Sequence, residues 1–140
     1  MEFVRTLKAL ADPLRLRILA AVSEEELTVG EVQEVVESVQ SSVSRNLAIL
    51  RAAGFVQDRK EGTSVYFSAR EDMPEAARDL FTSLQARLAA IPEVKRDQTR
   101  LAECRRRRLQ RHRTQRHVQR GRRGDDQWHR RTRRRFRRYV

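Results

Sequence analysis

The chain has 140 residues, a formal net charge of +12 and a single cysteine. This length supports one hydrophobic core, one cysteine excludes an intramolecular disulfide, and no apolar run approaches the roughly 20 residues that span a bilayer. We therefore expect a soluble cytoplasmic protein with one folded domain and no membrane segment.

The positive charge is concentrated at the C-terminal end of the chain. Residues 1–94 contain 11 Lys and Arg against 15 Asp and Glu, a net charge of −4, whereas residues 95–140 contain 20 against 4, a net charge of +16. Apolar residues also become sparse after Pro92. We therefore divide the chain into a folded domain, residues 1–92, and an Arg-rich tail, residues 93–140. Because like charges repel and little apolar surface is available to bury, we expect the tail to be partly helical or disordered.

The chain begins with a short helix whose apolar residues Phe3, Leu7 and Leu10 share one face. Asp12 and Pro13 follow it. This pair suits the start of a second helix, with Asp12 as the N-cap and Pro13 in the first turn. The buried face of the second helix consists of Leu14, Ile18, Leu19 and Val22.

A third helix is expected to start at Thr28, because Thr28 and Glu31 have the spacing of a capping box. Valines follow at positions 32, 35, 36 and 39, and they do not alternate with polar residues as they would in a half-buried strand. Only a few residues around Glu37 and Ser38 separate this helix from the next one. A connection that short makes two helices cross steeply, which is the geometry of a helix-turn-helix.

The helix after this turn, residues 40–53, has one apolar face and one face of short polar residues. The apolar face consists of Val43, Leu47 and Leu50, and the opposite face of Ser41, Ser42, Ser44, Arg45 and Asn46. Such polar side chains can bond to base edges or phosphates in a DNA major groove, and Arg suits guanine best. We therefore take Gln40 and the five polar residues as candidate DNA contacts. Gly54 then ends the helix.

Two β-prone segments, residues 55–60 and 63–68, follow Gly54 and flank the turn at Gly62. A hairpin directly after a recognition helix is the wing of a winged helix. Arg59, Lys60 and Thr63 are expected near its tip, where they would reach a phosphate or the minor groove.

The last helix runs from Pro74 to about residue 91, and its apolar stripe is longer than a small winged helix needs to cover itself. We infer a homodimer that buries the excess apolar surface of the first and last helices against a partner chain. The candidate interface residues are Phe3, Leu7, Leu10, Leu80, Phe81, Leu84 and Leu88. The predicted fold is thus mainly α with a small β-hairpin, a winged helix-turn-helix that dimerises through its first and last helices.

Four stretches, residues 9–19, 26–31, 40–47 and 51–56, resemble successive signatures of the ArsR/SmtB family of bacterial winged-helix repressors. The resemblance covers about residues 3–91. It implies a homodimer that binds double-stranded operator DNA and represses a nearby operon until an effector weakens its hold. We therefore expect a DNA-binding transcriptional regulator.

The chain departs from that family at several positions. Thr28 and Gly30 stand where the best-known metal sensors carry two cysteines, and the last helix, residues 74–91, has no His, Cys or paired-carboxylate pattern for the family's other metal site. We therefore expect neither a metal nor a cofactor. Asn46 stands where many members have His, which affects base preference.

The tail leaves other interpretations open. Cys104 beside four arginines could be a redox-sensitive thiol, and His112, His117 and His129 could join it in a metal site; we favour the view that these residues have no special role. The tail could also act alone as a non-specific nucleic-acid or polyanion binder, with Trp128, Phe136 and Tyr139 stacking on bases.

The abundance of Arg over Lys in the tail also suits an extension read in a shifted frame. The ArsR/SmtB resemblance implies relatives in which the regulator is fused to a methyltransferase domain. One specific version of this alternative is therefore a truncated or frame-shifted fusion of that kind. The chain has no Gly-rich phosphate loop, nucleophile elbow or clustered carboxylates, so we do not expect an enzyme.

Overall fold

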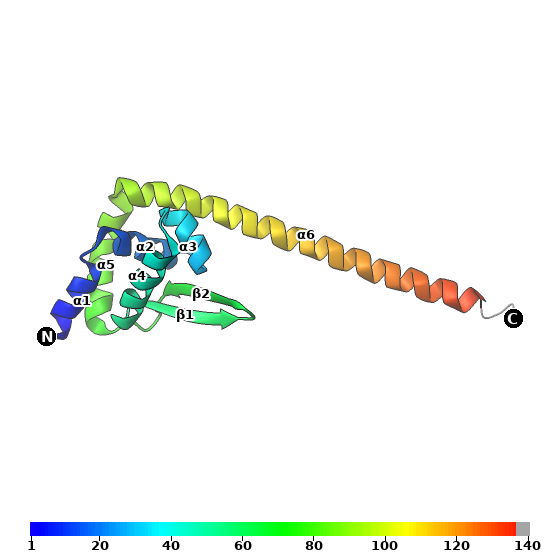
Figure 1. Ribbon diagram of the computed structural model, residues 1–140, viewed down its shortest axis with the longest axis horizontal. Helices are drawn as coiled ribbons and strands as arrows, with labels where there is room; N and C mark the ends of the chain where they lie inside the picture. The colour runs from blue at the N-terminus through cyan, green and yellow to red at the C-terminus, as the bar shows by residue number, and fades with distance from the viewer. Residues whose placement is uncertain (137–140) are drawn as a thin grey trace. The chain divides into compact units, whose positions relative to one another are not determined.

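The computed structural model describes residues 1–136, and the side chains of residues 1–116 (Figure 1). Its elements are α1 (Glu2–Leu10), α2 (Pro13–Glu24), α3 (Val29–Val36), α4 (Gln40–Ala52), β1 (Val56–Glu61), β2 (Ser64–Ala69), α5 (Glu75–Ala90) and α6 (Pro92–Phe136). The chain forms one compact unit that ends at Cys104, and the remainder forms a second unit. The predicted fold class, mainly α with a two-stranded antiparallel hairpin, is confirmed.

The core of the first unit lies between α2, α3 and α4, and Figure 1 shows α1 and α5 side by side next to them. The apolar faces of α2, α3 and α4 are almost fully buried, and each such side chain contributes about 1.5–3 kcal/mol through the hydrophobic effect. They comprise Ile18, Leu19, Val22, Val32, Val35, Val36, Val43, Leu47 and Leu50. The spacing of apolar residues in the sequence predicted these nine residues, but it also placed Leu14 and Val39 on the buried faces, and Leu14 is half-buried and Val39 is exposed.

The starts of α2 and α3 have the predicted caps. The Asp12 side chain accepts a hydrogen bond from the Arg15 N–H at 3.0 Å, and Pro13 occupies the first turn. At α3, Thr28 Oγ1 accepts from the Glu31 N–H at 3.2 Å, while Glu31 Oε1 accepts from the Thr28 N–H at 3.5 Å. Each cap satisfies backbone donors that the helix itself leaves without a partner.

Helix α4 ends at a glycine, as its sequence indicated. Gly54 has φ +86°, the left-handed region that a residue with a side chain rarely adopts. The Gly54 N–H donates to Arg51 O at 3.1 Å and the Phe55 N–H to Leu50 O at 3.0 Å, which is the Schellman pattern. Phe55 is fully buried, so this ending also directs the chain from the helix into the core.

The hairpin pairs β1 with β2 from Val56 opposite Ala69 to Glu61 opposite Ser64, with Gly62 at φ +60° in the two-residue turn. Its base is anchored to the segment between α2 and α3. The Leu27 N–H donates to Phe67 O at 3.0 Å, and the Phe67 N–H donates to Leu27 O at 2.7 Å. The wing is therefore attached to the helical core as well as to α4.

The first turns of α6 belong to the folded unit, although the sequence predicts that this unit ends at residue 92. Val94, Asp97, Leu101 and Cys104 are buried, and their spacing puts them on one helical face. The compact unit therefore continues to Cys104. The segment expected to be partly helical or disordered is helical as far as Phe136. Among the residues that the structure describes, no helix combines the length and apolarity needed to cross a membrane.

Gly54→Ala should lower the free energy of unfolding by about 2 kcal/mol. The new Cβ would meet Pro74 Cδ at 2.8 Å and Cγ at 2.9 Å, in addition to the strain of a positive φ. Gly62→Ala is the matched control, because Gly62 has φ +60° with nothing within 4 Å of its Cβ position, and it should cost only about 1 kcal/mol. Urea unfolding followed by circular dichroism measures both; equal losses would contradict a tight contact at Gly54.

Candidate nucleic-acid interface

The exposed face of α4 carries most of the side chains that the sequence proposed for DNA contact. Gln40, Ser41, Ser44 and Arg45 are exposed, and Ser42 is half-buried. Within the part of the chain that the structure describes, the Arg45 side chain makes no hydrogen bond or ion pair. The N-cap residue Val39 provides no side-chain cap, so the first-turn N–H groups of α4 have no side-chain acceptor. This end of α4 combines a guanidinium, hydroxyls and backbone donors.

Asn46 does not lie on that exposed face, contrary to the sequence analysis. It is only 4% exposed, and position 46 lies three residues after Val43 and four before Leu50, on the buried side of the helix. Its Nδ2 donates to Ser42 O at 2.9 Å, and its Oδ1 accepts from Arg15 Nη1 at 3.2 Å. The amide therefore positions α4, and it is not available to a base.

Arg15 joins three helices, a role that the sequence analysis missed. Besides its bond to Asn46, its Nε donates to Ala9 O at 2.6 Å and its Nη2 to Lys8 O at 3.3 Å. Both carbonyls belong to the last turn of α1, where Lys8 O also accepts from the Ala11 N–H at 3.3 Å. Periodicity gave no signal for this role, because Arg15 lies outside the apolar stripe of α2.

The turn between α3 and α4 is held by arginines from α2 and α6. Arg17 Nη2 donates to Val36 O at 2.9 Å, and Arg100 Nε donates to Val35 O at 2.6 Å. Both bonds end on carbonyls in the last turn of α3, just before Glu37, which has φ +50°. Val39, grouped with the α3 valines in the sequence, belongs to this turn.

Asp97 joins the two arginines. Its side chain is 3% exposed, and it accepts from Arg17 Nε and Nη2, both at 2.8 Å, and from Arg100 Nη2 at 2.7 Å. The hydrogen bond to Asp97 is the main cause that raises the pKa of Arg17 above its ordinary value. A buried carboxylate with charged donors on both oxygens is well satisfied, so the first turns of α6 are tied to the helix-turn-helix.

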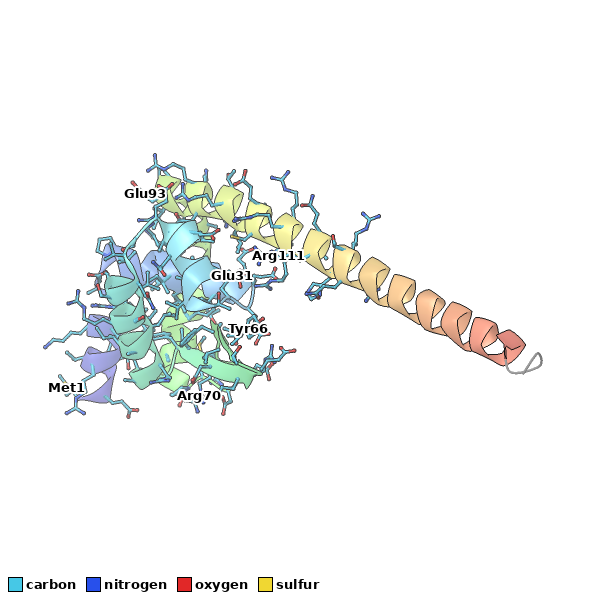
Figure 2. The ribbon with its side chains drawn as sticks, turned by 45° about the vertical axis from the view of Figure 1, so that its right-hand side comes forward. Met1, Glu31, Tyr66, Arg70, Glu93 and Arg111 are labelled. Carbon is cyan, nitrogen blue, oxygen red and sulfur yellow. The ribbon has the colours of Figure 1, made fainter. Side chains whose placement is uncertain are left out.

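The wing carries a mixture of charges. Arg59 donates to both carboxylate oxygens of Glu26, at 3.0 and 2.9 Å, and to Glu61 at 2.9 Å. Its guanidinium carbon lies 5.1 Å from the centroid of the Tyr66 ring, and Tyr66 is labelled in Figure 2. These carboxylates, Glu26 first, raise the pKa of Arg59 above its ordinary value, so it stays protonated. Lys60 and Thr63 are exposed, and Lys60 makes no ion pair among the described residues. Lys60 therefore provides the wing's uncompensated charge.

The proposed dimer residues divide into two groups. Phe3 and Leu7 are 54% and 41% exposed on α1, and Leu80, Phe81 and Leu84 are half-buried on α5. Leu10 and Leu88, by contrast, are buried inside the protomer and have little surface left for a partner. An apolar strip on neighbouring helices α1 and α5 thus remains open.

No group of three or more His, Cys, Asp and Glu that could hold a metal ion occurs among the residues whose side chains are described. Cys104 is buried and donates to Glu34 Oε2 at 3.5 Å. The side chains of His117, His129, Trp128 and Phe136, and all of Tyr139, lie outside the described part of the chain. Their suggested roles remain predictions.

A steep helix-turn-helix, an exposed polar face on its second helix and a β-hairpin wing define a winged helix-turn-helix DNA-binding protein. A family model described as a helix-turn-helix domain matches residues 10–59. The transcriptional activator HlyU of Vibrio cholerae serotype O1 is 38% identical over 78 residues, which cover 56% of this chain and 72% of that protein. The biofilm growth-associated repressor of Agrobacterium fabrum is 36% identical over 92 residues, 66% of this chain and 76% of the relative.

A solved structure agrees with these relatives. The homodimeric winged helix-turn-helix DNA-binding domain of a possible ArsR-family regulator from Mycobacterium bovis superposes with a TM-score of 0.53 at 30% identity, over 61% of this chain and 76% of that one. The chain belongs to the ArsR/SmtB family of winged helix-turn-helix transcriptional regulators. It is a DNA-binding regulator of transcription.

Asp97→Asn should lower the free energy of unfolding by about 3 kcal/mol, because it leaves two partly buried guanidiniums without their shared carboxylate. Chemical denaturation measures the loss. Glu93→Gln is the matched control on the same helix: its partner Arg96 is at 3.5 Å and both side chains are at least half exposed, so it should change stability by less than about 0.5 kcal/mol. A loss no larger than that of the control would contradict the role assigned to Asp97.

Proposed function

We propose that the protein is a homodimeric, operator-binding repressor in which α4 of each protomer enters a major groove. The observation that carries this proposal is the exposed end of α4, where Arg45 makes no ion pair within the described residues and the serines beside it are accessible. Arginine forms bidentate bonds with guanine, and serine hydroxyls bond to bases or phosphates. The first-turn N–H groups of α4 suit a phosphate as well.

The proposed contacts follow from exposure and charge. Gln40, Ser41, Ser42, Ser44 and Arg45 would meet the major groove, and Lys60 and Thr63 would reach the backbone beside it. Arg59 would contribute less to phosphate binding than Lys60, since Glu26 and Glu61 already bond to its guanidinium. The start of α3 is a further place at which a phosphate could be bound, since a helix N-terminus favours anions. Its N-cap residue Thr28 is unsuitable as a donor, because its hydroxyl caps α3 and donates to Glu31 Oε1 at 3.1 Å.

The dimer in this proposal forms through α1 and α5. Phe3 and Leu7 are exposed apolar side chains one helical turn apart, and burying them against a second copy would remove them from water. The Mycobacterium bovis relative is described as homodimeric. Two-fold symmetry would then place the two α4 helices on half-sites about one helical turn of DNA apart.

Repression is the simpler direction for such a dimer. Occupying an operator is enough to block transcription, whereas activation needs a further surface for the transcription machinery. The Agrobacterium relative is named a repressor and the Vibrio relative an activator. The proposed activity is binding without catalysis, and it would take place in the cytoplasm, where the operator lies.

Arg45→Ala should weaken binding to the DNA upstream of the protein's own gene by about 1–3 kcal/mol, because it removes the base-reading guanidinium. Fluorescence anisotropy on this duplex and on a scrambled duplex, at the same salt concentration, measures affinity and selectivity. Arg45→Lys separates two roles: it should restore binding if Arg45 contacts a phosphate, and leave it weak if Arg45 reads guanine.

Arg78→Ala is the control for this experiment, since Arg78 is an exposed arginine on α5 that makes no ion pair within the described residues and lies on the side of the helix away from Leu80. It should leave both affinities unchanged. If Arg45→Ala behaves like Arg78→Ala on both duplexes, α4 does not read the operator through this residue. If the unmodified protein does not distinguish the two duplexes, the operator-binding proposal fails as a whole.

A further inference from the structure

The two units of the chain have opposite charge. Residues 1–104 contain 14 Lys and Arg against 17 Asp and Glu, a net charge of −3. Residues 105–140 contain 17 Arg against 2 Asp, a net charge of +15, and the two values give the +12 of the whole chain. The folded unit that carries the winged helix would therefore be repelled, on balance, by the phosphates of its own operator.

Most arginines in the folded unit are already engaged. Arg17 and Arg100 hold Asp97, Arg51 is 3.3 Å from Asp58, and Arg59 bonds to Glu26 and Glu61. On the proposed DNA surface, Arg45 and Lys60 are the cations that have no carboxylate partner among the described residues. Two cations per protomer are few for a protein family whose ligand carries one negative charge per about 1.7 Å of helix axis.

We propose that the Arg-rich segment, residues 105–140, is a second DNA-binding element that contacts phosphates and supplies the sequence-independent affinity that the folded unit lacks. This inference rests on the proposed function, because it assigns base reading to α4 and electrostatic attraction to the segment. Guanidinium groups suit this task, since they form bidentate bonds with phosphate oxygens and keep their charge at any physiological pH.

The structure of the segment supports a phosphate ligand. It is helical as far as Phe136, and Arg111, which Figure 2 labels, is exposed, as are Arg113 and Arg116. Arg111 lies on one side of the helix, and Arg113 and Arg116, three residues apart, lie on the other. Leu109 is also exposed. A helix with cations around its axis and no continuous apolar stripe is unsuited to burial against a protein, but it can lie against a polyanion.

The folded unit's own acidic surface is a weaker candidate for the segment's partner. If the segment neutralised the entire net charge of −3 on residues 1–104, it would still carry +12. That surplus positive charge attracts an external polyanion. Because the segment and the winged helix belong to one chain, binding of the winged helix to its operator raises the local concentration of DNA around the segment. The charge balance therefore favours DNA over an intramolecular partner.

The test uses the full-length chain with Arg111, Arg113 and Arg116 replaced together by Gln. Anisotropy titrations on the upstream and scrambled duplexes, between roughly 50 and 200 mM salt, give the slope of log K against log salt. The slope should become shallower by about 0.9 for each of these arginines that contacts a phosphate, and by the same amount on both duplexes, so that the ratio of the two affinities is unchanged. The matched control replaces the same three residues by Lys and should keep the original slope.

Three results would overturn the inference. An unchanged slope in the Gln variant would mean that Arg111, Arg113 and Arg116, whose exposed side chains support the inference, do not contact DNA phosphates. An increase in affinity would mean that the segment covers the folded unit and competes with DNA. Tighter binding of the unmodified protein to single-stranded RNA than to either duplex would assign the segment to a different ligand. Failure of the operator-binding proposal looks different, because it removes the preference for the upstream duplex in the unmodified protein.

Discussion

The helix-turn-helix of this fold depends on the buried carboxylate of Asp97. A carboxylate in the interior destabilises a protein unless charged donors satisfy it, and Arg17 and Arg100 do so from α2 and from within α6. The same guanidiniums bond to the last carbonyls of α3, so the direction in which the chain turns into α4 is coupled to the first turns of α6. The helix-turn-helix is thus supported by a segment that follows the wing and α5 in the chain.

The other contacts of α4 make its exposed face a rigid platform. Asn46 and Arg15 fix its middle against α2 and α1, and Gly54 ends it in a geometry that a larger residue would strain. Side chains on a helix held in this way need little reordering on binding, which favours specific recognition. Under the two proposals made above, the chain separates two tasks: the folded unit provides selectivity, and the strongly cationic segment provides electrostatic attraction.

Local patterns in the sequence predicted helices α1 to α5, the caps of α2 and α3, the hairpin and the glycine that ends α4, because each depends on residues within a few positions of one another. The contacts that orient α4 could not be predicted in this way. Arg17 and Asp97 are 80 residues apart, and Arg100 bonds to a carbonyl 65 residues away. The polarity of Asn46 suggests an exposed position, although its spacing from Val43 and Leu50 puts it on the buried face. The buried face from Val94 to Cys104 is hard to recognise in the sequence, because Asp97 interrupts its apolar stripe and many arginines surround it. The DNA contacts themselves remain predictions, since exposure alone does not identify a base.

The most direct measurement places α4 on DNA by cleavage from a single site. In a Cys104→Ser background, Ser41→Cys would carry an iron–EDTA cleavage reagent, and Thr82→Cys on α5 would carry it as the control. If the account is correct, the Ser41 position cuts the upstream duplex at two major-groove positions about one helical turn apart, and the Thr82 position does not. Cleavage spread evenly along the duplex, or no stronger from Ser41 than from Thr82, would contradict the claim that two α4 helices read the operator.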